Sequence, residues 1–376
     1  MSETRKYIAM YKTLRGDIAA GTIQVGDKLP SDQEMAKRFG VSQSTATRAM
    51  AMLTEEGILR RTPKRGTFVI ARPRKGTRAV GVIADSRGHF HGDFAQVLTE
   101  KLLKAGLYPV CVNTDLYNEA TSVPDNMTLV QLLQNIIADQ PYGFIINGDR
   151  YMPFEFIKQQ QARMGKIVFV NNYLNSEDID ASHCLIDCRA VGRMIADYFG
   201  GRGWRRMAYL SMAMPRYIAK YGNSPQEIIA SGMDEYCRKN GLYFDRITTD
   251  RFFGGELPIK TLGELKASGR LPDAVATHSD SFCARELYPV CASLHIRIPE
   301  DMSVLGYYNT PWCSQVDPDL SSVDLCPAQL AAGCVELLLN PERRERFVSA
   351  RIVERSSVLR GMSTEQSRNG RKAGGV

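Results

Sequence analysis

Residues 29–69 read L-P-S-D-Q-E-M-A-K-R-F-G-V-S-Q-S-T-A-T-R-A-M-A-M-L-T-E-E-G-I-L-R-R-T-P-K-R-G-T-F-V. This stretch predicts the fold of the N-terminal part of the chain. Ser31 and Glu34 have the spacing of a capping box, in which the two side chains satisfy the first backbone amides of a helix. A helix is therefore predicted to begin at Asp32. Gly40 is expected to end it, because glycine adopts the left-handed backbone at no steric cost.

A second helix is predicted after Ser42, which is another good N-cap. Its apolar residues recur at helical spacing until Gly57, at Ala46, Ala49, Met50 and Leu53. Two strands, 58–61 and 67–70, then flank the basic turn 62–66, Thr-Pro-Lys-Arg-Gly. The pattern predicts a helix-turn-helix followed by a wing with a basic tip.

This pattern favours binding of double-stranded DNA, with the second helix in the major groove and the wing on the backbone or minor groove. The alternative is a helical hairpin that only packs inside a larger domain. Gln pairs with adenine, Arg with guanine or phosphate, and Ser or Thr with either. The outward residues of the second helix are expected to be Gln43, Ser44, Thr45, Thr47 and Arg48, and the DNA-binding set adds Ser31, Gln33, Ser42, Lys64, Arg65 and Gly66.

The charge distribution supports the DNA interpretation. Residues 1–78 hold 16 Lys and Arg against 7 Asp and Glu, a net charge of +9, whereas the whole chain carries +7. The basic excess therefore lies on the helix-turn-helix segment, as phosphate binding requires.

The 376 residues suffice for two domains, and we find no apolar run of about 18 residues and no signal-peptide core. We expect a cytoplasmic protein without a membrane partner.

Residues 5–70 resemble the GntR family of winged-helix repressors. The matching residues are Leu29-Pro30-Ser31, Gly40-Val41-Ser42, Thr45, Ala49, Leu53, Glu56-Gly57 and Gly66 to Val69. The chain departs from the family at four positions: Gln33, Gln43 and Thr47 stand where the family usually has Arg, and Lys64 replaces a usual glycine of the wing. The resemblance therefore implies DNA binding but no particular operator sequence.

Around this stretch, 3–20 is predicted to be an amphipathic helix, Ile23 and Val25 a short strand that pairs with the wing, and 71–78 a basic linker. From residue 79 onward, apolar runs of strand length alternate with helical segments. The runs are 79–83, 108–112, 143–146, 167–170, 207–210, 274–277 and 302–306, with helices such as 94–105, 129–138, 190–199 and 225–240. This alternation predicts an α/β domain of parallel sheets covered on both faces.

The second part resembles the LacI-type effector domain, a two-lobed module similar to periplasmic binding proteins. The match is most specific at Leu271 to Asp280, Ile298 to Tyr307, Pro318 to Val323 and Leu330 to Leu339. A GntR-like head on such a domain resembles the arabinose-repressor type of regulator. The predicted boundaries are 1–70 for the winged helix-turn-helix domain, 71–78 for the linker, 79–361 for the effector-binding and dimerisation domain, and 362–376 for a disordered tail.

In parallel α/β sheets, ligands bind beyond the carboxyl ends of the strands. The resemblance implies a small sugar-like effector there, and each candidate has a plainer alternative as a helix cap or core residue. The effector-binding candidates are Asp85, Arg87, His89, Phe90, Asn147, Asp149, Asp187, Asp280, Tyr308, Asn309 and Trp312, with Asn171 and Asn172 also past a strand end. Two sugar-clamping groups usual in the family are replaced by Ile229 and by Tyr308-Asn309, so the ligand is expected to be unusual or differently held.

No cofactor and no metal site are predicted. His89-Phe90-His91 and the pair Cys184 and Cys188 lack a companion ligand motif, and the nine cysteines are expected to be reduced and mostly buried. The chain is predicted to be a homodimeric repressor of carbohydrate-utilisation genes that a small effector releases from its operator. The alternatives are a GntR-type head on an enzymatic, aminotransferase-like domain or on a ligand-independent one, and an exported solute receptor; we find no catalytic motif for an enzyme.

Overall fold

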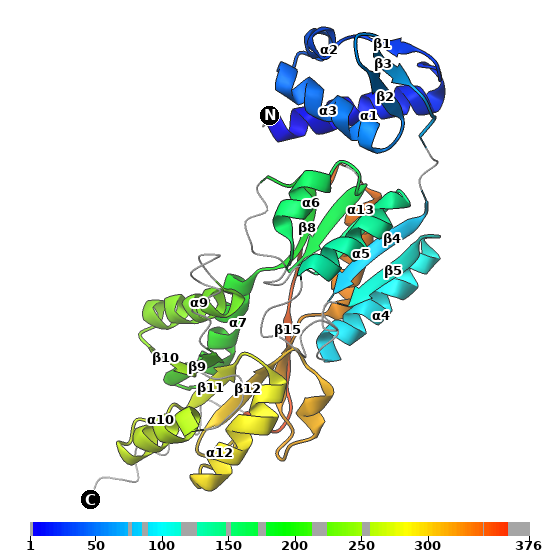
Figure 1. Cartoon of the computed structure of the whole chain (residues 1–376). Coiled ribbons are helices and arrows are strands. Elements are labelled where there is room, and N and C mark those ends of the chain that lie inside the picture. Colours follow the sequence, from blue (N-terminus) through cyan, green and yellow to red (C-terminus); the bar gives the residue numbers. More distant parts are fainter. Residues whose placement is uncertain are drawn as a thin grey trace, which may run out of the picture.

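The structure of the chain is a computed structural model that describes residues 3–73, 77–84, 89–113, 126–147, 152–171, 178–212, 224–249, 256–340 and 342–359. Figure 1 shows a small N-terminal domain, here called the head, next to a domain of two lobes. The predicted linker is only partly within these ranges, and the predicted tail lies outside them. Among the described helices, none is long and apolar enough to cross a membrane.

The head combines three helices with a small antiparallel sheet of order β1-β3-β2. Its elements are α1 (Glu3–Ala20), β1 (Lys28–Leu29), α2 (Asp32–Phe39), α3 (Gln43–Glu55), β2 (Leu59–Thr62) and β3 (Gly66–Val69). The predicted capping box at Ser31 is present, and Gly40 is left-handed with φ of 61°. The winged helix-turn-helix prediction is therefore confirmed, with each wing strand displaced by one residue.

The predicted strand at Ile23 and Val25 is wrong. The strand that pairs with β3 is instead Lys28–Leu29. A tight turn interrupts the earlier segment, because the Asp27 carboxylate accepts a hydrogen bond from the Gln24 amide at 2.7 Å. Val25 is left 51% exposed on this turn.

The lobe nearer the head, called the N-lobe, is built on a parallel six-stranded sheet of order β14-β8-β7-β6-β4-β5. Its strands are β4 (Ala79–Ala84), β5 (Tyr108–Asn113), β6 (Gly143–Asn147), β7 (Lys166–Val170), β8 (Ala181–Ile186) and β14 (Glu345–Val348), and its helices are α4 (His89–Lys104), α5 (Asn126–Ala138), α6 (Phe154–Gln160) and α13 (Pro327–Leu339). The strands predicted at 79–83, 108–112, 143–146 and 167–170 are confirmed.

The other lobe, the C-lobe, has a six-stranded sheet of order β10-β9-β11-β12-β13-β15 in which β15 alone is antiparallel to its neighbour. Its strands are β9 (Arg206–Met212), β10 (Tyr243–Thr249), β11 (Ala274–Thr277), β12 (Ser303–Tyr307), β13 (Ser321–Asp324) and β15 (Arg351–Val353). The helices are α7 (Cys188–Gly200), α9 (Pro225–Lys239), α10 (Glu256–Ala267), α11 (Asp280–Phe282), the π-helix Cys283–Leu287, α12 (Tyr288–Ser293) and the 3₁₀ helix Pro311–Ser314.

The chain crosses between the lobes three times, from β8 to α7, from β13 to α13 and from β14 to β15. Two crossings are joined by an ion pair, because Arg351 donates from Nε and Nη2 to one oxygen of Asp324 at 3.0 and 2.9 Å. The shared apolar core runs through both lobes. All nine cysteines are free thiols, and eight are buried, whereas Cys111 on the edge strand β5 is exposed.

Candidate nucleic-acid interface and effector site

The second helix of the helix-turn-helix, α3, presents a polar face. Gln43, Ser44, Thr47 and Arg48 are exposed, and so are Lys64 and Arg65 in the turn of the wing. The Arg48 guanidinium lies 4.0 Å from the ring centroid of Tyr7 on α1, a cation–π contact that holds the arginine against the helix surface. The exposed set has the hydrogen-bonding groups that base edges and phosphates require.

Three of the other predicted DNA-binding residues, Ser31, Ser42 and Gly66, hold the backbone in place. Ser31 and Ser42 are N-caps that accept from the Glu34 and Thr45 amides at 3.3 and 3.2 Å. Gly66 has φ of 112°, which closes the wing hairpin, and Gln33 is exposed. The expectation that Thr45 faces outward is wrong. Thr45 is 5% exposed, because the third residue of α3 turns toward α2 and its hydroxyl lies 2.7 Å from the Ser42 hydroxyl.

Sequence reasoning missed Asp32 and Arg61 on the same surface. Arg61 on β2 donates to both carboxylate oxygens of Asp32 at 3.1 and 2.9 Å. Thr47 donates to Asp32 at 2.7 Å, so α2, α3 and the wing meet at this carboxylate. The consecutive arginines 60 and 61 just before the basic turn were the available signal for Arg61.

The head rests on the N-lobe through a polar contact, which we call the seam, made by Tyr11, Arg15, Glu56, Gln140 and Arg163. Glu56 is central: its carboxylate is 4% exposed, lies 3.2 Å from Arg15 Nε and 3.8 Å from Arg163 Nε, and accepts a hydrogen bond from Tyr11. Arg15 also donates to Gln140 of the N-lobe. Burial and the Glu56 charge raise the pKa of Tyr11, so its phenol remains a donor.

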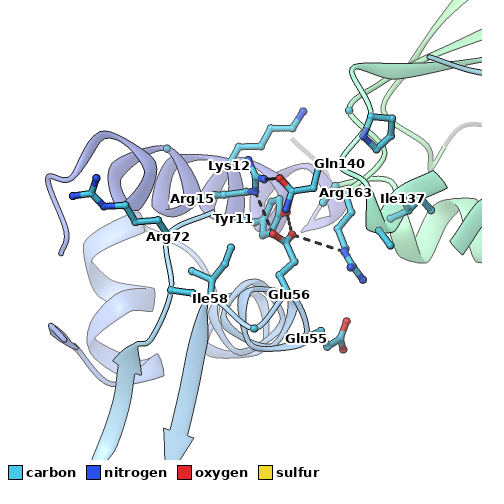
Figure 2. A pocket seen from close by; sticks show the side chains of 17 residues that line it. Tyr11, Lys12, Arg15, Glu55, Glu56, Ile58, Arg72, Ile137, Gln140 and Arg163 are labelled. Carbon is cyan, nitrogen blue, oxygen red and sulfur yellow. Dashed lines mark hydrogen bonds and ion pairs between the residues drawn. The ribbon is translucent and has the colours of Figure 1, made fainter. Parts of the chain in front are cut away.

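Figure 2 shows these side chains converging at the edge of a pocket of about 600 Å³ between the head and the N-lobe. Ala162 of the N-lobe is 5% exposed and packs with the core of the head. The seam therefore combines a small apolar contact with a buried carboxylate shared by both domains. Beside these contacts, the pocket separates the surfaces of the head and the N-lobe. Interfaces of this polar kind allow domains to move relative to one another.

Polar side chains and strained backbone are found at the carboxyl ends of strands in both lobes. Asn147 ends β6, and Asn171 follows β7 with φ of 47°. In the C-lobe, Tyr308 and Asn309 follow β12 with φ of 95° and 52°. Left-handed backbone in residues other than glycine costs about 1–3 kcal/mol and gathers at functional sites. These strand ends are therefore the candidate effector site.

Hydrogen bonds hold the C-lobe side of this site. The Asn309 side chain accepts from Arg355 at 2.8 Å, and its amide donates to Ser322 at 3.0 Å. Asp280 is 0% exposed and accepts from the Thr310 amide, the Thr310 hydroxyl and the Ser322 hydroxyl at 2.7, 2.9 and 2.6 Å. Asp280 therefore supports the loop beside the site, with its carboxylate oxygens taken up by these internal hydrogen bonds.

The remaining candidates lie in different surroundings. Asp187 is exposed and caps α7 by accepting from the Ala190 amide at 2.9 Å. Trp312 is half-buried in the 3₁₀ helix after Asn309. Asp85, Arg87, Asp149 and Asn172 lie outside the described residues, and His89 and Phe90 begin α4 with side chains that are not described.

His278 directly follows β11 and was missed from the sequence. Burial lowers the pKa of His278 to about 4, although a hydrogen bond to the Leu210 backbone opposes the shift, so the ring is neutral at pH 7. Its Nδ1 atom is buried and has no hydrogen-bond partner among the described residues. The signal in the sequence was its position directly after a strand, but Asp280 was chosen as the candidate after that strand instead. In the described parts of the chain, His, Cys, Asp and Glu do not gather in groups of three that suit a metal ion.

Comparisons with known proteins identify both parts of the chain. Residues 6–69 match the family of bacterial regulatory proteins called the gntR family, and residues 196–358 match the periplasmic binding protein-like domain. The Uxu operon regulator of Haemophilus influenzae is 35% identical over 69 residues, which are 18% of this chain and 26% of that protein. The chain thus spans about a quarter of the curated relatives that match its head.

Solved structures show the same fold over longer stretches. A periplasmic binding protein/LacI transcriptional regulator from Alkaliphilus metalliredigens, complexed with D-xylulofuranose, has a TM-score of 0.57 at 16% identity, covering 76% of this chain and 100% of that one. The complex of the transcriptional regulator CelR with cellobiose has a TM-score of 0.59 at 17% identity, covering 93% and 99%. Residues 6–69 are therefore a gntR-family regulatory domain, and the two-lobed part that follows is a periplasmic-binding-protein-like domain of the LacI-regulator fold.

Proposed function

We propose that this chain is a ligand-responsive, cytoplasmic DNA-binding regulator, most specifically a repressor of carbohydrate-utilisation genes that a small sugar-like effector releases from its operator. One observation carries the proposal: an exposed, basic helix-turn-helix face is joined to two parallel-sheet lobes whose strand ends carry polar side chains and left-handed backbone. The structures of similar fold include sugar complexes, which supports the sugar class. An aminotransferase-like second domain, the alternative from the sequence, is not the fold observed.

The candidate effector site suits a polyhydroxy ligand. The buried Nδ1 atom of His278 has no hydrogen-bond partner among the described residues, so a ligand hydroxyl that reaches it would find a free ring nitrogen to pair with. Tyr308 and Trp312 follow the end of β12, and an aromatic face covers the C–H surface of a sugar ring. We expect the lobes to close on the ligand by movement at the three chain segments that cross between them.

A homodimer is part of the proposal. A dimer places two recognition helices in successive major grooves, about 34 Å apart. Large apolar side chains are exposed along one edge of the N-lobe, where Leu103, Tyr108 and Val110 are 54, 60 and 39% exposed on α4 and β5. A second copy of the chain covering this edge would remove that surface from water.

Effector binding tests the proposal. In a thermal-shift panel of sugars, sugar acids and sugar phosphates, one compound is expected to stabilise the full chain by about 2.7 kcal/mol at 100 times its dissociation constant. The same compound should release DNA selected by the chain from a random pool. Trp312→Ala should lose the shift, while the control Tyr243→Ala, at an edge of the C-lobe where the ring is 59% exposed, should keep it. A panel without any stabilising compound would argue against a sugar effector.

Arg48 tests the DNA-binding half. Arg48→Ala is expected to weaken binding of the selected DNA by about 1–3 kcal/mol, because it removes a base or phosphate contact from α3. The melting temperature should change little, since Arg48 is exposed. Fluorescence anisotropy measures the affinity, and Arg270→Ala, exposed in the C-lobe, is the matched control. Equal affinities of the two variants would remove Arg48 from the interface.

A further inference from the structure

Three polar side chains meet beside the recognition helix. Asp32 opens α2, Thr47 lies on the exposed face of α3, and Arg61 lies on β2. The Thr47 hydroxyl lies 2.7 Å from Asp32 Oδ2, and Arg61 Nη2 lies 2.9 Å from the same oxygen. The Asp32 and Arg61 side chains are 16% and 44% exposed, so the cluster is accessible from the surface that α3 presents.

The direction of the hydrogen bond between Thr47 and Asp32 follows from their chemistry. A carboxylate can only accept, whereas a hydroxyl has one proton to donate and two lone pairs. Hydrogen bonds to a charged acceptor are roughly twice as strong as neutral ones, so Asp32 outcompetes a base edge for the Thr47 proton. Thr47 therefore presents DNA with an oxygen that accepts and a methyl group, and with no free donor.

We propose that Asp32 determines the base preference of α3 at one operator position by fixing Thr47 as an acceptor. In the major groove, adenine N6 and cytosine N4 are donors, whereas guanine N7 and O6 and thymine O4 are acceptors. Thr47 then selects a base whose amino group it faces and disfavours guanine. This inference rests on the proposed DNA-binding function and adds the chemical class of base that one residue reads.

Arg61 explains how a carboxylate is tolerated on this surface. An unpaired acidic group beside the phosphate backbone would be repelled, and the ion pair with Arg61 offsets that charge. Only one guanidinium nitrogen of Arg61 contacts Asp32, and arginine carries five N–H donors. The remaining donors can bind a phosphate and so fix the register in which Thr47 meets its base. Asp32 is thus a positioning residue, and Arg61 a backbone contact.

The experiment measures base preference rather than affinity alone. The full chain first selects its operator from a random pool, and binding is then measured to duplexes in which each position carries each of the four bases. The wild type should prefer adenine or cytosine at one position by about 5- to 150-fold, the range of a single mismatch.

In Asp32→Asn the side-chain amide can donate to Thr47, which frees the hydroxyl proton, so this preference should vanish or turn toward guanine or thymine. Thr47→Val should abolish it, and Thr47→Ser should retain it.

Glu55→Gln is the matched control, since it removes the same charge from an exposed position at the far end of α3. It should leave every base preference unchanged. A role of Asp32 in stability alone would weaken all duplexes equally, which would overturn the inference, as would an unchanged preference in both Asp32→Asn and Thr47→Val. The Thr47 variants decide the matter if Asp32→Asn does not fold. Failure of the wild type to select any sequence would instead overturn the proposed function, and this inference with it.

Discussion

Glu56→Ala is expected to lower the free energy of unfolding of the head by about 3 kcal/mol. The Glu56 carboxylate is 4% exposed and shared by Arg15 of the head, Arg163 of the N-lobe and the Tyr11 hydroxyl. Removing one partner from a buried ionic network leaves the others without compensation, at a cost of about 3–5 kcal/mol. The lower end applies here, because the Arg15 and Arg163 side chains are 25% and 22% exposed and retain some water. Thermal or urea unfolding of the full chain measures the loss.

The adjacent residue provides the control. Glu55→Ala removes the same kind of side chain from an exposed position and should change the free energy of unfolding by no more than about 0.5 kcal/mol. Arg163→Ala removes only the N-lobe half of the ion pairs, so it should loosen the docking of the head while Arg15 still pairs with Glu56. Equal destabilisation by the Glu55 and Glu56 substitutions would show that the buried carboxylate has no special part in the seam.

The head was predictable because its signals are local. The capping box at Ser31, the left-handed Gly40 and the N-cap Ser42 each act within four residues, and each is found where the spacing predicts it. The short strand before the wing was not predictable in the same way. Its choice of Lys28–Leu29 over Ile23 and Val25 depends on pairing with β3 and on the Asp27 turn, which apolar spacing does not report.

In the second domain, buried central strands such as β6 and β7 read as continuous apolar runs and were predictable. Strands β8, β10, β13, β14 and β15 were missed, since they lie at or near the sheet edges and mix polar with apolar residues, as in Ala181–Ile186 and Glu345–Val348. The order of the sheets, with β14 returning to the N-lobe, depends on contacts between residues more than 150 positions apart, and no local pattern carries it.

For the candidate sites, the sequence predicted where a residue lies relative to a strand end, but it did not predict which way the side chain points. Asn147 is the last residue of β6, and Tyr308 and Asn309 follow β12, so all three lie at strand ends as expected. Thr45 turns inward because its hydroxyl pairs with that of the N-cap Ser42. Asp280 turns inward because its carboxylate accepts hydrogen bonds from one amide and two hydroxyls. The seam could not be predicted either, since Glu56 looks like an ordinary charged helix end until Arg163 is brought to it.

Asp280→Ala is expected to destabilise the chain by about 3–5 kcal/mol and to disturb the loop that carries Tyr308, Asn309 and Trp312. The substitution leaves the Thr310 amide and the Thr310 and Ser322 hydroxyls without their acceptor, and an unsatisfied buried donor costs about 1–3 kcal/mol. Asp280 packs so tightly on Gly306 that a Cβ there would lie 2.2 Å from Asp280 Oδ1, so the substitution also removes this packing contact. Urea unfolding measures the loss, and Asp187→Ala, an exposed helix cap, should cost only about 1 kcal/mol.

The pH dependence of the isosteric variant Asp280→Asn separates the charge of Asp280 from its shape. Burial raises the pKa of Asp280 above its ordinary value of 3.8, although the hydrogen bonds from Ser322 and Thr310 lower it. Above pH 3.8 the unfolded chain therefore binds fewer protons than the folded chain, so the contribution of Asp280 is fully present below 3.8 and is lost as the pH rises through the folded-state pKa. The unfolding free energy of the wild type minus that of Asp280→Asn should accordingly fall as the pH rises from about 4 and then level off. A difference that rises over this range would mean that the hydrogen bonds outweigh burial, so that Asp280 is stabilised as a carboxylate and holds the loop beside the effector site chiefly through its charge.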